Sequence, residues 1–105
     1  MKLIPLRIFG RAPAVLAVSI GGMNTAVDEI VVFEGSFYSI FAVAYRGNLH
    51  FIALIKINNH IFEYDGLVQG GLLRRVASDL HIFSNIYTST SGSAMKAQIV
   101  WYKKC

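Results

Sequence analysis

His50 and Asp65 are the two residues of this chain whose types and spacing could do chemistry. An imidazole that a carboxylate holds in one tautomer is a general base, and the pair forms two of the three members of a nucleophilic triad. The third member, the nucleophile, is not evident from the sequence. Ser19, Ser36 and Ser39 are alternatives for a serine triad, but none lies in the Gly-x-Ser-x-Gly elbow that presents a nucleophilic serine.

The pairing of this histidine with this aspartate depends on a predicted β-hairpin. Residues 50–57 and 60–65 have the composition of two strands, and Asn58-Asn59 between them tolerates the positive φ that a two-residue loop requires. Such a loop places the imidazole and the carboxylate on one face as diagonal neighbours, with Cα atoms about 7–8 Å apart. A three-residue loop or a bulge would send one of them to the opposite face.

The other histidines and the glycine-rich segment are expected to be structural. His60 begins the second strand of the hairpin, where alternation puts it on the opposite face from Asp65, exposed to solvent. His81 has no acidic residue near it that would argue for a site. Gly70-Gly71 ahead of Arg74-Arg75 lacks the spacing and the Lys-Ser/Thr pair of a phosphate-binding loop. We therefore expect no cofactor and no metal.

Composition limits the class of protein. The chain has 105 residues, of which 54% are hydrophobic and 15% charged, so it is at most one domain, is not disordered, and has apolar residues in excess of a small core. The net charge of +4 arises from ten Lys or Arg against six Asp or Glu. Apart from Arg74-Arg75 and Lys103-Lys104, the basic residues are scattered, and they are not interleaved with aromatic residues as in a nucleic-acid platform. We therefore expect no nucleic-acid partner.

Cysteine content and the longest apolar run indicate the compartment. Cys105 is the only cysteine, which excludes disulfides and cysteine-based metal sites and favours an intracellular location, in cytoplasm or nucleus. It would serve as a nucleophile only if the tail folded back onto His50, which we do not expect. The uncharged run over residues 12–27 is short for a membrane span and is interrupted by Pro13 and Gly21-Gly22. We expect a buried strand there and no membrane partner.

The elements that must position the dyad are mostly strands. Beyond the hairpin, the patterns predict strands at residues 14–20, 30–33, 37–45 and 96–103. Turns are expected at 34–36 and 46–48, an irregular lead-in or edge strand at 1–11, loops at 23–29 and 84–94, and a short helix at 72–80, where Leu73, Val76, Ala77 and Leu80 have helical spacing. The expected fold class is α+β, mainly an antiparallel β-sheet with at most a short helix.

The aromatic residues are expected to supply much of the core, because core burial is where such side chains usually lie. This prediction covers five residues: Phe37, Phe41, Phe51, Phe62 and Trp101. On the last strand, simple alternation places Trp101 on one face together with Ala97 and Ile99.

Four blocks of the sequence, taken in order, resemble the C-terminal half of the catalytic domain of ubiquitin-specific proteases, a branch of the papain-like cysteine peptidases. Residues 13–20 resemble the family's strand that begins with proline and continues with aliphatic residues. Residues 37–47, which run Phe-Tyr-Ser-Ile-Phe-Ala-Val-Ala-Tyr-Arg-Gly, resemble its Tyr-x-Leu-x-Ala-Val…Gly strand. Residues 49–56 through 61–65, Leu-His-Phe-Ile-Ala-Leu-Ile-Lys through Ile-Phe-Glu-Tyr-Asp, resemble its histidine box, and 97–103 resemble its closing strand.

The resemblance implies a papain-like palm subdomain, with His50 as general base, Asp65 as its orienting partner, and ubiquitin or a ubiquitin-like protein as the binding partner. In the family, the nucleophilic cysteine lies far upstream at the start of a helix, and this sequence has no counterpart. The chain also departs from the family pattern elsewhere. Leu49 stands where the family usually has glycine, Gly66 stands where a second aspartate is common, and the fingers region that grips ubiquitin is absent.

Three hypotheses follow for residues 1–105 as a single partial domain. The first is a fragment or degenerate copy of a cysteine-type deubiquitinating peptidase, a thiol protease that carries base and orienter but no nucleophile and is inactive alone. The second is a non-catalytic β-rich module that binds a ubiquitin-like or other protein. The third, a small membrane-associated protein, is favoured only by hydrophobicity. Under the first hypothesis an apolar sheet face is bare, so the chain is expected to self-associate or to bind the missing N-terminal half.

Overall fold

The computed structural model describes residues 2–3, 13–21, 27–47, 50–65, 73–77, 83–84, 86–88, 92 and 94–105. All regular structure within these residues is β-strand, and none of it is helix. The strands, in chain order, are β1 (Lys2–Leu3), β2 (Val15–Ser19), β3 (Ile30–Phe33), β4 (Ser36–Gly47), β5 (His50–Ile57), β6 (His60–Tyr64), β7 (Leu73–Ala77), β8 (Ile86–Thr88) and β9 (Ala94–Lys104). The expected strands at 14–20, 30–33, 37–45, 50–57, 60–65 and 96–103 are thus confirmed to within a few residues.

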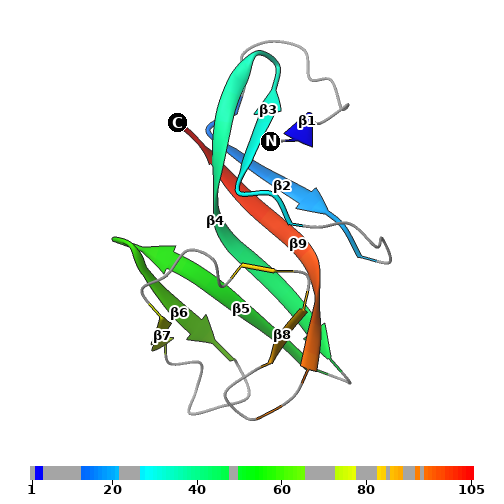
Figure 1. Cartoon of the computed structure of the whole chain (residues 1–105), viewed down its shortest axis with the longest axis vertical. Helices are drawn as coiled ribbons and strands as arrows, with labels where there is room; N and C mark the ends of the chain where they lie inside the picture. Colours follow the sequence, from blue (N-terminus) through cyan, green and yellow to red (C-terminus); the bar gives the residue numbers. More distant parts are fainter. Residues whose placement is uncertain are drawn as a thin grey trace.

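All of these strands belong to one sheet, whose spine is the long pair β4 and β9 (Figure 1). One side of β4 pairs with β3 near its start and with β5 near its end, and the path continues from β5 to β6 and β7. The edge of β9 that faces away from β4 pairs with β8 near the start of β9 and with β2 near its end. Every pairing is antiparallel except the short parallel pair β1–β3. The mainly antiparallel sheet predicted from the sequence is therefore confirmed.

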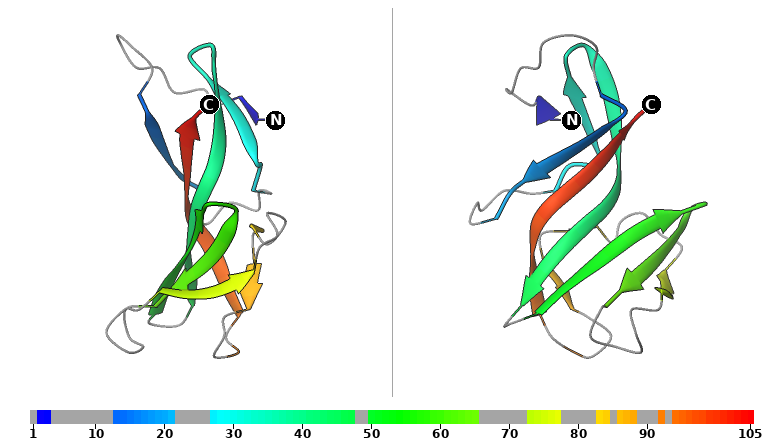
Figure 2. Two further views of the ribbon diagram at one scale, coloured as in Figure 1. Left: turned by 90° about the vertical axis from the view of Figure 1, so that its left-hand side faces the viewer. Right: turned by 180° about the vertical axis from the view of Figure 1, so that it is seen from behind.

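The sheet is strongly coiled, so that its lower half curls into an open trough (Figure 2). The hydroxyl of Tyr87 on β8 donates a hydrogen bond of 2.9 Å to the Glu63 carboxylate on β6, although β9, β4 and β5 separate these strands in the sheet. The ring of Tyr87 also lies 5.4 Å from that of Tyr45 on β4, centroid to centroid. We call the concave side that these residues occupy the inner face, and the opposite side the outer face.

The inner face carries the hydrophobic core. Its fully buried side chains come from five strands, β3, β4, β5, β6 and β9, and include Val31, Tyr38, Val43, Tyr45, Leu54, Ile61 and Met95. Buried tyrosines satisfy their hydroxyls on loop carbonyls: Tyr38 donates to Pro13, Tyr45 to Ser84 and Tyr102 to Asp28, at 2.6, 2.7 and 2.8 Å. These bonds tie the loops to the concave side of the sheet.

The outer face is apolar as well, but it is open to solvent. Of the described residues, eight large hydrophobic side chains are exposed, and the strand registers and alternation place all of them on this face: Val15, Ile30, Phe37, Phe51, Ile57, Tyr64, Leu73 and Ile86. Between them lie half-buried residues of the same face, among them Ile55, Phe62, Ile99 and Trp101. No described strand covers this surface.

The prediction of an aromatic core is therefore wrong in part. Phe37 is 55% exposed and Phe51 is 58% exposed, while Phe41, Phe62 and Trp101 are only partly buried. The tyrosines of the strand that contains Phe37 are buried, but the phenylalanine at its start points outward. The reason is alternation: each exposed phenylalanine has fully or largely buried neighbours on the inner face.

Two irregularities in the β4–β9 pairing set which residues share a face. The register shifts between Ile40 and Ala42, where Phe41 is extra, and between Ala44 and Tyr45, where Gln98 is extra on β9. An extra residue on one strand reverses its alternation from that point on. Ala97 consequently lies on the inner face and Ile99 with Trp101 on the outer face, so the predicted grouping of these three residues is wrong.

Two further predictions were wrong about local structure. The helix expected at 72–80 is the strand β7 where the structure describes it, because Leu73–Ala77 pairs with β6, and pairing outweighs a helical spacing of four apolar residues. The loop expected at 84–94 contains β8, which pairs with the start of β9. Of the turn expected at 46–48, Arg46 and Gly47 belong to β4, and Asn48 lies outside the described residues.

The two predicted tight turns are confirmed by their backbone angles. Glu34 and Gly35 between β3 and β4 have φ of 49° and 76°, and Asn58 and Asn59 between β5 and β6 have φ of 50° and 64°. Positive φ at both central residues is the requirement of the two-residue type I′ hairpin loop. The second turn fixes the alternation of the hairpin that carries the dyad. No helix of the described residues is long and apolar enough to span a membrane.

Candidate functional site

The predicted hairpin places His50 beside Asp65. The cross-strand pairs, from Ile57 with His60 to Ala53 with Tyr64, have the register of a hairpin with a two-residue loop. Asp65 follows directly after β6. The imidazole Nε2 lies 2.7 Å from the carboxylate Oδ1, a short hydrogen bond. The geometric prediction made from the sequence, that the two side chains share a face within hydrogen-bonding reach, is confirmed. We call this pair the dyad.

The dyad lies at the margin of the inner face, where it is largely shielded from water. The side chain of His50 is 19% exposed and that of Asp65 is 10% exposed. A carboxylate buried to this extent needs a donor, and the imidazole supplies one. With Nε2–H donating to the carboxylate, the neutral ring carries its lone pair on Nδ1, which is then the atom able to accept a proton from a third group. The arrangement is that of a base fixed in one tautomer.

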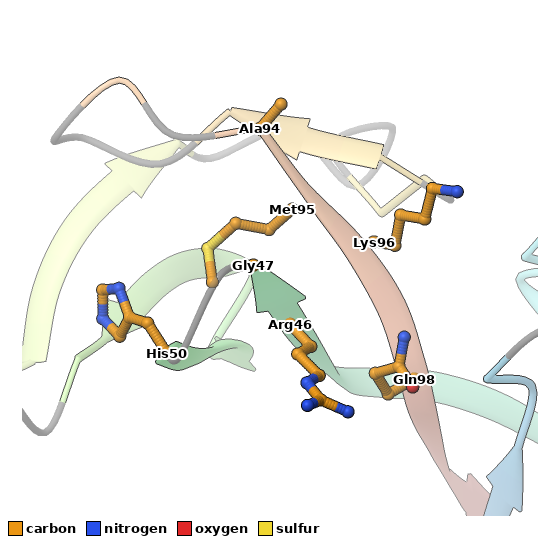
Figure 3. Close-up of a pocket in the computed structure, with 7 residues that line it drawn as sticks. All are labelled: Arg46, Gly47, His50, Ala94, Met95, Lys96 and Gln98. Carbon is orange, nitrogen blue, oxygen red and sulfur yellow. The ribbon is translucent and has the colours of Figure 1, made fainter.

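An open pocket of about 520 Å³ lies next to the histidine (Figure 3). It is lined by the end of β4, the start of β5 and the first half of β9: Arg46, Gly47, His50, Ala94, Met95, Lys96 and Gln98. In the close-up, the Met95 side chain extends toward His50, whereas Arg46 and Gln98 lie together on the other side of Gly47 and Lys96 points away. The pocket lining therefore includes the imidazole, the guanidinium of Arg46 and the amide of Gln98, whereas the ammonium of Lys96 points away.

Gly47 allows the close approach of strands beside this pocket. A Cβ at Gly47 would lie 3.3 Å from Cγ and 3.4 Å from Cε of Met95, which is tight contact with a flexible side chain. Gly47 is also the cross-strand partner of His50. A side chain placed here would lie on the inner face, next to the imidazole.

The described residues bring no nucleophile to the dyad. Cys105 is exposed, and its backbone N–H bonds to the carbonyl of Phe37 at the start of β4. His50 pairs with Gly47 at the end of β4, ten residues further along, a separation of about 33 Å at strand rise. The prediction that Cys105 does not serve the histidine of its own chain therefore agrees with the structure.

The candidate serines are also far from the histidine. Ser36 begins β4 opposite Phe33, and Ser39 lies three residues later, opposite Lys103. Ser19, at the end of β2, points to the outer face, which is opposite to that of the dyad. None of the three completes a serine triad.

Those of the other predicted features that lie within the described residues form no site. His60 is half-buried and not exposed as expected, and among the described residues its Nδ1 is a buried atom with no hydrogen-bond partner. His81 and Gly70-Gly71 lie outside the described residues. Within the part of the chain that the structure describes, no group of three His, Cys, Asp or Glu is placed to hold a metal.

Two buried tyrosines have strongly shifted ionisation. Burial raises the pKa of Tyr45 to about 12, although a backbone hydrogen bond with Ser84 acts in the opposite direction. Burial also raises the pKa of Tyr102 to about 12, and the nearby negative charge of Asp28 adds to the effect. Both phenols are core donors to loop carbonyls, so we assign them to stability.

Sequence reasoning missed the exposed aromatic and basic surface of the outer face. Its aromatic and basic residues are far apart in the sequence, and only the cross-strand registers bring them together. Arg46, for example, packs its guanidinium over the ring of Phe51, 5.6 Å from the centroid, because the two residues face each other on β4 and β5. The alternation of each strand was the available signal, but the bulges at Phe41 and Gln98 obscured it.

Fold and site together define a mainly antiparallel β-sheet protein with a His–Asp dyad at the margin of its concave face. Comparison of the chain with protein-family models, with curated proteins and with solved structures finds no match in any of the three. The resemblance to ubiquitin-specific proteases therefore rests on the sequence blocks, on their order and on the dyad.

Proposed function

We propose that this chain carries the base-and-orienter half of a cysteine-type peptidase site that acts on ubiquitin or ubiquitin-like conjugates. The observation that carries the proposal is the 2.7 Å contact between Nε2 of His50 and Oδ1 of Asp65. The papain-like palm is the fold that the proposal implies. The nucleophile is a cysteine of a second polypeptide segment, because the single cysteine of this sequence lies at the far end of the sheet.

The order of strands and the position of the dyad support the proposal. The resemblance implies that His50 begins a strand and that Asp65 ends the strand paired with it. In the structure, His50 is the first residue of β5, and Asp65 directly follows β6. The open pocket beside His50 leaves room for a second segment next to the imidazole. The low exposure of the carboxylate strengthens its hold on the ring, because the effective dielectric constant is lower away from water.

The chemistry assigned to each residue is that of a thiol–imidazole pair. Nδ1 of His50 takes the proton of the cysteine thiol, and the thiolate attacks the carbonyl carbon at the C-terminus of the ubiquitin-like protein. The imidazolium then gives the proton to the departing amine as the thioester forms, and water releases the acid by the reverse sequence. Asp65 orients the ring and stabilises its cationic form throughout.

An installed thiol tests whether the dyad works as a base. Gly47→Cys in a Cys105→Ser chain places a sulfur beside the histidine at its cross-strand partner position. A thiol next to such a base ionises at lower pH. We expect alkylation by iodoacetamide at pH 6 to be about tenfold faster than in the same chain with His50→Gln, and to be slowed by Asp65→Asn.

The control is a thiol on the other side of the sheet. Phe51→Cys, also with Cys105→Ser, exposes a sulfur on the outer face, and its alkylation should be indifferent to His50→Gln. Equal rates of alkylation of the Gly47→Cys thiol with and without the imidazole would mean that the dyad does not act as a base.

The substrate class needs a separate measurement. The chain should not turn over a fluorogenic ubiquitin substrate, because His50 and Asp65 alone cannot form an acyl intermediate. It should bind ubiquitin, and titration of ¹⁵N-labelled ubiquitin should move the resonances of its C-terminal residues. Unchanged spectra with ubiquitin and with ubiquitin-like proteins would overturn the substrate class and leave the dyad without a peptidase role.

A second candidate function, a non-catalytic β-rich binding module, is favoured by the open apolar outer face. It differs from the first in its dependence on the dyad. Protein binding that is unaffected by His50→Gln and Asp65→Asn but lost on Phe51→Glu would favour the module.

A further inference from the structure

We propose that the outer face of the sheet binds single-stranded nucleic acid. The proposal concerns the face of the sheet opposite to the dyad, and two of its residues, Arg46 and Lys96, also line the pocket beside His50. It rests on the charges and rings that the strand registers bring together on that face.

The first observation is the distribution of charge. The outer face carries the basic residues Arg46, Arg75, Lys96 and Lys103, and no Asp or Glu of the described strands points to it. The carboxylates of Glu63 on β6 and of Asp65 directly after β6 are buried on the inner face. Within the described strands, a face that carries these four cations and no carboxylate is complementary to a polyanion.

The second observation is the position of the rings. Phe51 and Phe37 are each more than half exposed, and Tyr64 is 43% exposed. Trp101 and Phe62 are partly exposed and lie in one cross-strand row of the outer face. The row continues to Arg75 on β7. Exposed aromatic rings on a sheet offer stacking surfaces to unpaired bases, and the surrounding cations meet the phosphates.

The charge distribution makes a second copy of the chain a weaker occupant than a polyanion. Two outer faces packed together would bring like charges of the described strands close to one another, which limits self-association to a weak contact. A duplex is disfavoured for a different reason, since its bases are stacked within the helix and present no faces to the rings. Unpaired bases satisfy both the apolar and the basic parts of the surface.

Alternation explains why the sequence alone argued against nucleic acid. The only two basic doublets, Arg74-Arg75 and Lys103-Lys104, are each divided between the two faces. Arg75 lies opposite Phe62, whereas Arg74 lies opposite the buried Glu63. Lys103 lies opposite Ser39 and Val15, whereas Lys104 lies opposite the buried Tyr38.

The divided doublets supply a matched pair of variants for the test. All four side chains are exposed, and each double change removes two positive charges. The probe is a fluorescein-labelled oligothymidylate about 12 nucleotides long, a length within the site sizes of sheet-based single-strand binders, followed by fluorescence anisotropy. We expect Arg75→Ala with Lys103→Ala to weaken binding about tenfold more than Arg74→Ala with Lys104→Ala.

Stacking and salt give independent readouts. Trp101 is the only tryptophan, so quenching of its fluorescence on adding the unlabelled oligonucleotide reports a base at the outer face. Phe51→Ala should weaken binding about tenfold, by the loss of one stacked base. The logarithm of affinity should fall with the logarithm of salt concentration with a slope of about −3 for four phosphate contacts.

Several results would overturn the proposal. They are equal loss of affinity in the two double variants, equal affinity for a duplex of the same length, and unchanged Trp101 fluorescence at saturation. A stable dimer that persists when oligonucleotide is added would assign the outer face to self-association instead.

Discussion

The same strands build two faces that differ in what they expose and in what they can do. The inner face buries Tyr38, Tyr45 and Tyr102 and holds the dyad at its margin. Among the described strands, the outer face leaves eight large hydrophobic residues exposed and carries cations but no carboxylate. Hydrophobic residues thus have two different roles in this chain, and their position in the alternation, not their type, decides which one.

The difference also shows how one residue changes sides. Neighbours such as Met95 and Lys96, or Ile52 and Phe51, have opposite environments because successive side chains point to opposite faces. Conversely, the bulge at Gln98 places Trp101 on the face opposite to Ala97, four residues before it. Function on either face therefore depends on registers that a single inserted residue can reverse.

The largest expected effect separates the faces by stability. Leu54→Ala removes a side chain with 0% exposure from the inner face and should lower the free energy of unfolding by about 2–5 kcal/mol. Phe51→Ala removes a larger side chain from the outer face, but it should lower that free energy by no more than about 1 kcal/mol, because the ring is already mostly in water. Urea unfolding of both variants makes the comparison. Similar losses would mean that the outer face is covered in solution.

The next prediction concerns association through the bare face. At tens of micromolar the chain should self-associate weakly, as judged by sedimentation velocity, because exposed apolar patches of this kind drive association. Phe37→Glu with Phe51→Glu should return it to a monomer, and the proposed nucleic-acid ligand should compete with association. Lys104→Glu, which adds negative charge on the opposite face, is the control and should leave association unchanged. A wild-type chain that is monomeric under these conditions would contradict the prediction.

Alkaline pH should weaken the inner face specifically. Because the pKa of Tyr45 and of Tyr102 is raised from 10.0 to about 12, the unfolded chain releases these protons at lower pH than the folded chain does. Their contribution to stability is fully present below pH 10 and is lost as the pH rises through about 12. Urea midpoints measured across this window should fall with pH.

The tyrosines can be removed one at a time to check the source of that loss. Tyr45→Phe should lower stability at neutral pH, where the bond to Ser84 is lost, and should make the fall above pH 10 shallower. Tyr64→Phe, on the outer face, is the control and should change neither. An equally steep fall in the Tyr45→Phe chain would exclude the buried phenol as its cause.

The hairpin and the dyad were predictable because their determinants are local. Two adjacent asparagines specify a two-residue loop, and alternation over a few residues then fixes which side chains share a face. The distance between His50 and Asp65 follows from these rules alone. The strands predicted from β-branched and aromatic content were confirmed for the same reason.

The rest of the fold depends on distant pairings. Residues 73–77 have a spacing that suits a helix, and only the hydrogen bonds to β6 make them a strand. Ile86–Thr88 lies in a Ser/Thr-rich stretch, and it is a strand because it pairs with β9. The outer face was unpredictable because the bulges at Phe41 and Gln98 arise from the fit of β4 to β9, which no single segment encodes.

The smallest expected effect tests the turn on which the placement of the dyad depends. Asn59 has φ of 64°, a conformation that costs most L-residues roughly 1 kcal/mol or more and that Asn and Gly adopt easily. Asn59→Ala should therefore lower the free energy of unfolding by about 1 kcal/mol, and Asn59→Gly by only a few tenths. Urea unfolding measures both changes, and NMR of the ring nitrogens of His50 reports whether the dyad survives.

The two readouts should diverge in an informative way. If the loop keeps two residues, Asn59→Ala lowers stability but leaves the tautomer of His50 unchanged, because the registers of β5 and β6 still place Asp65 on the inner face. If the strained turn relaxes by taking in a third residue, alternation carries the carboxylate toward the outer face, and the tautomer preference is lost. Stability that is equal for alanine and glycine would mean that the positive φ of this turn does not hold the hairpin in register.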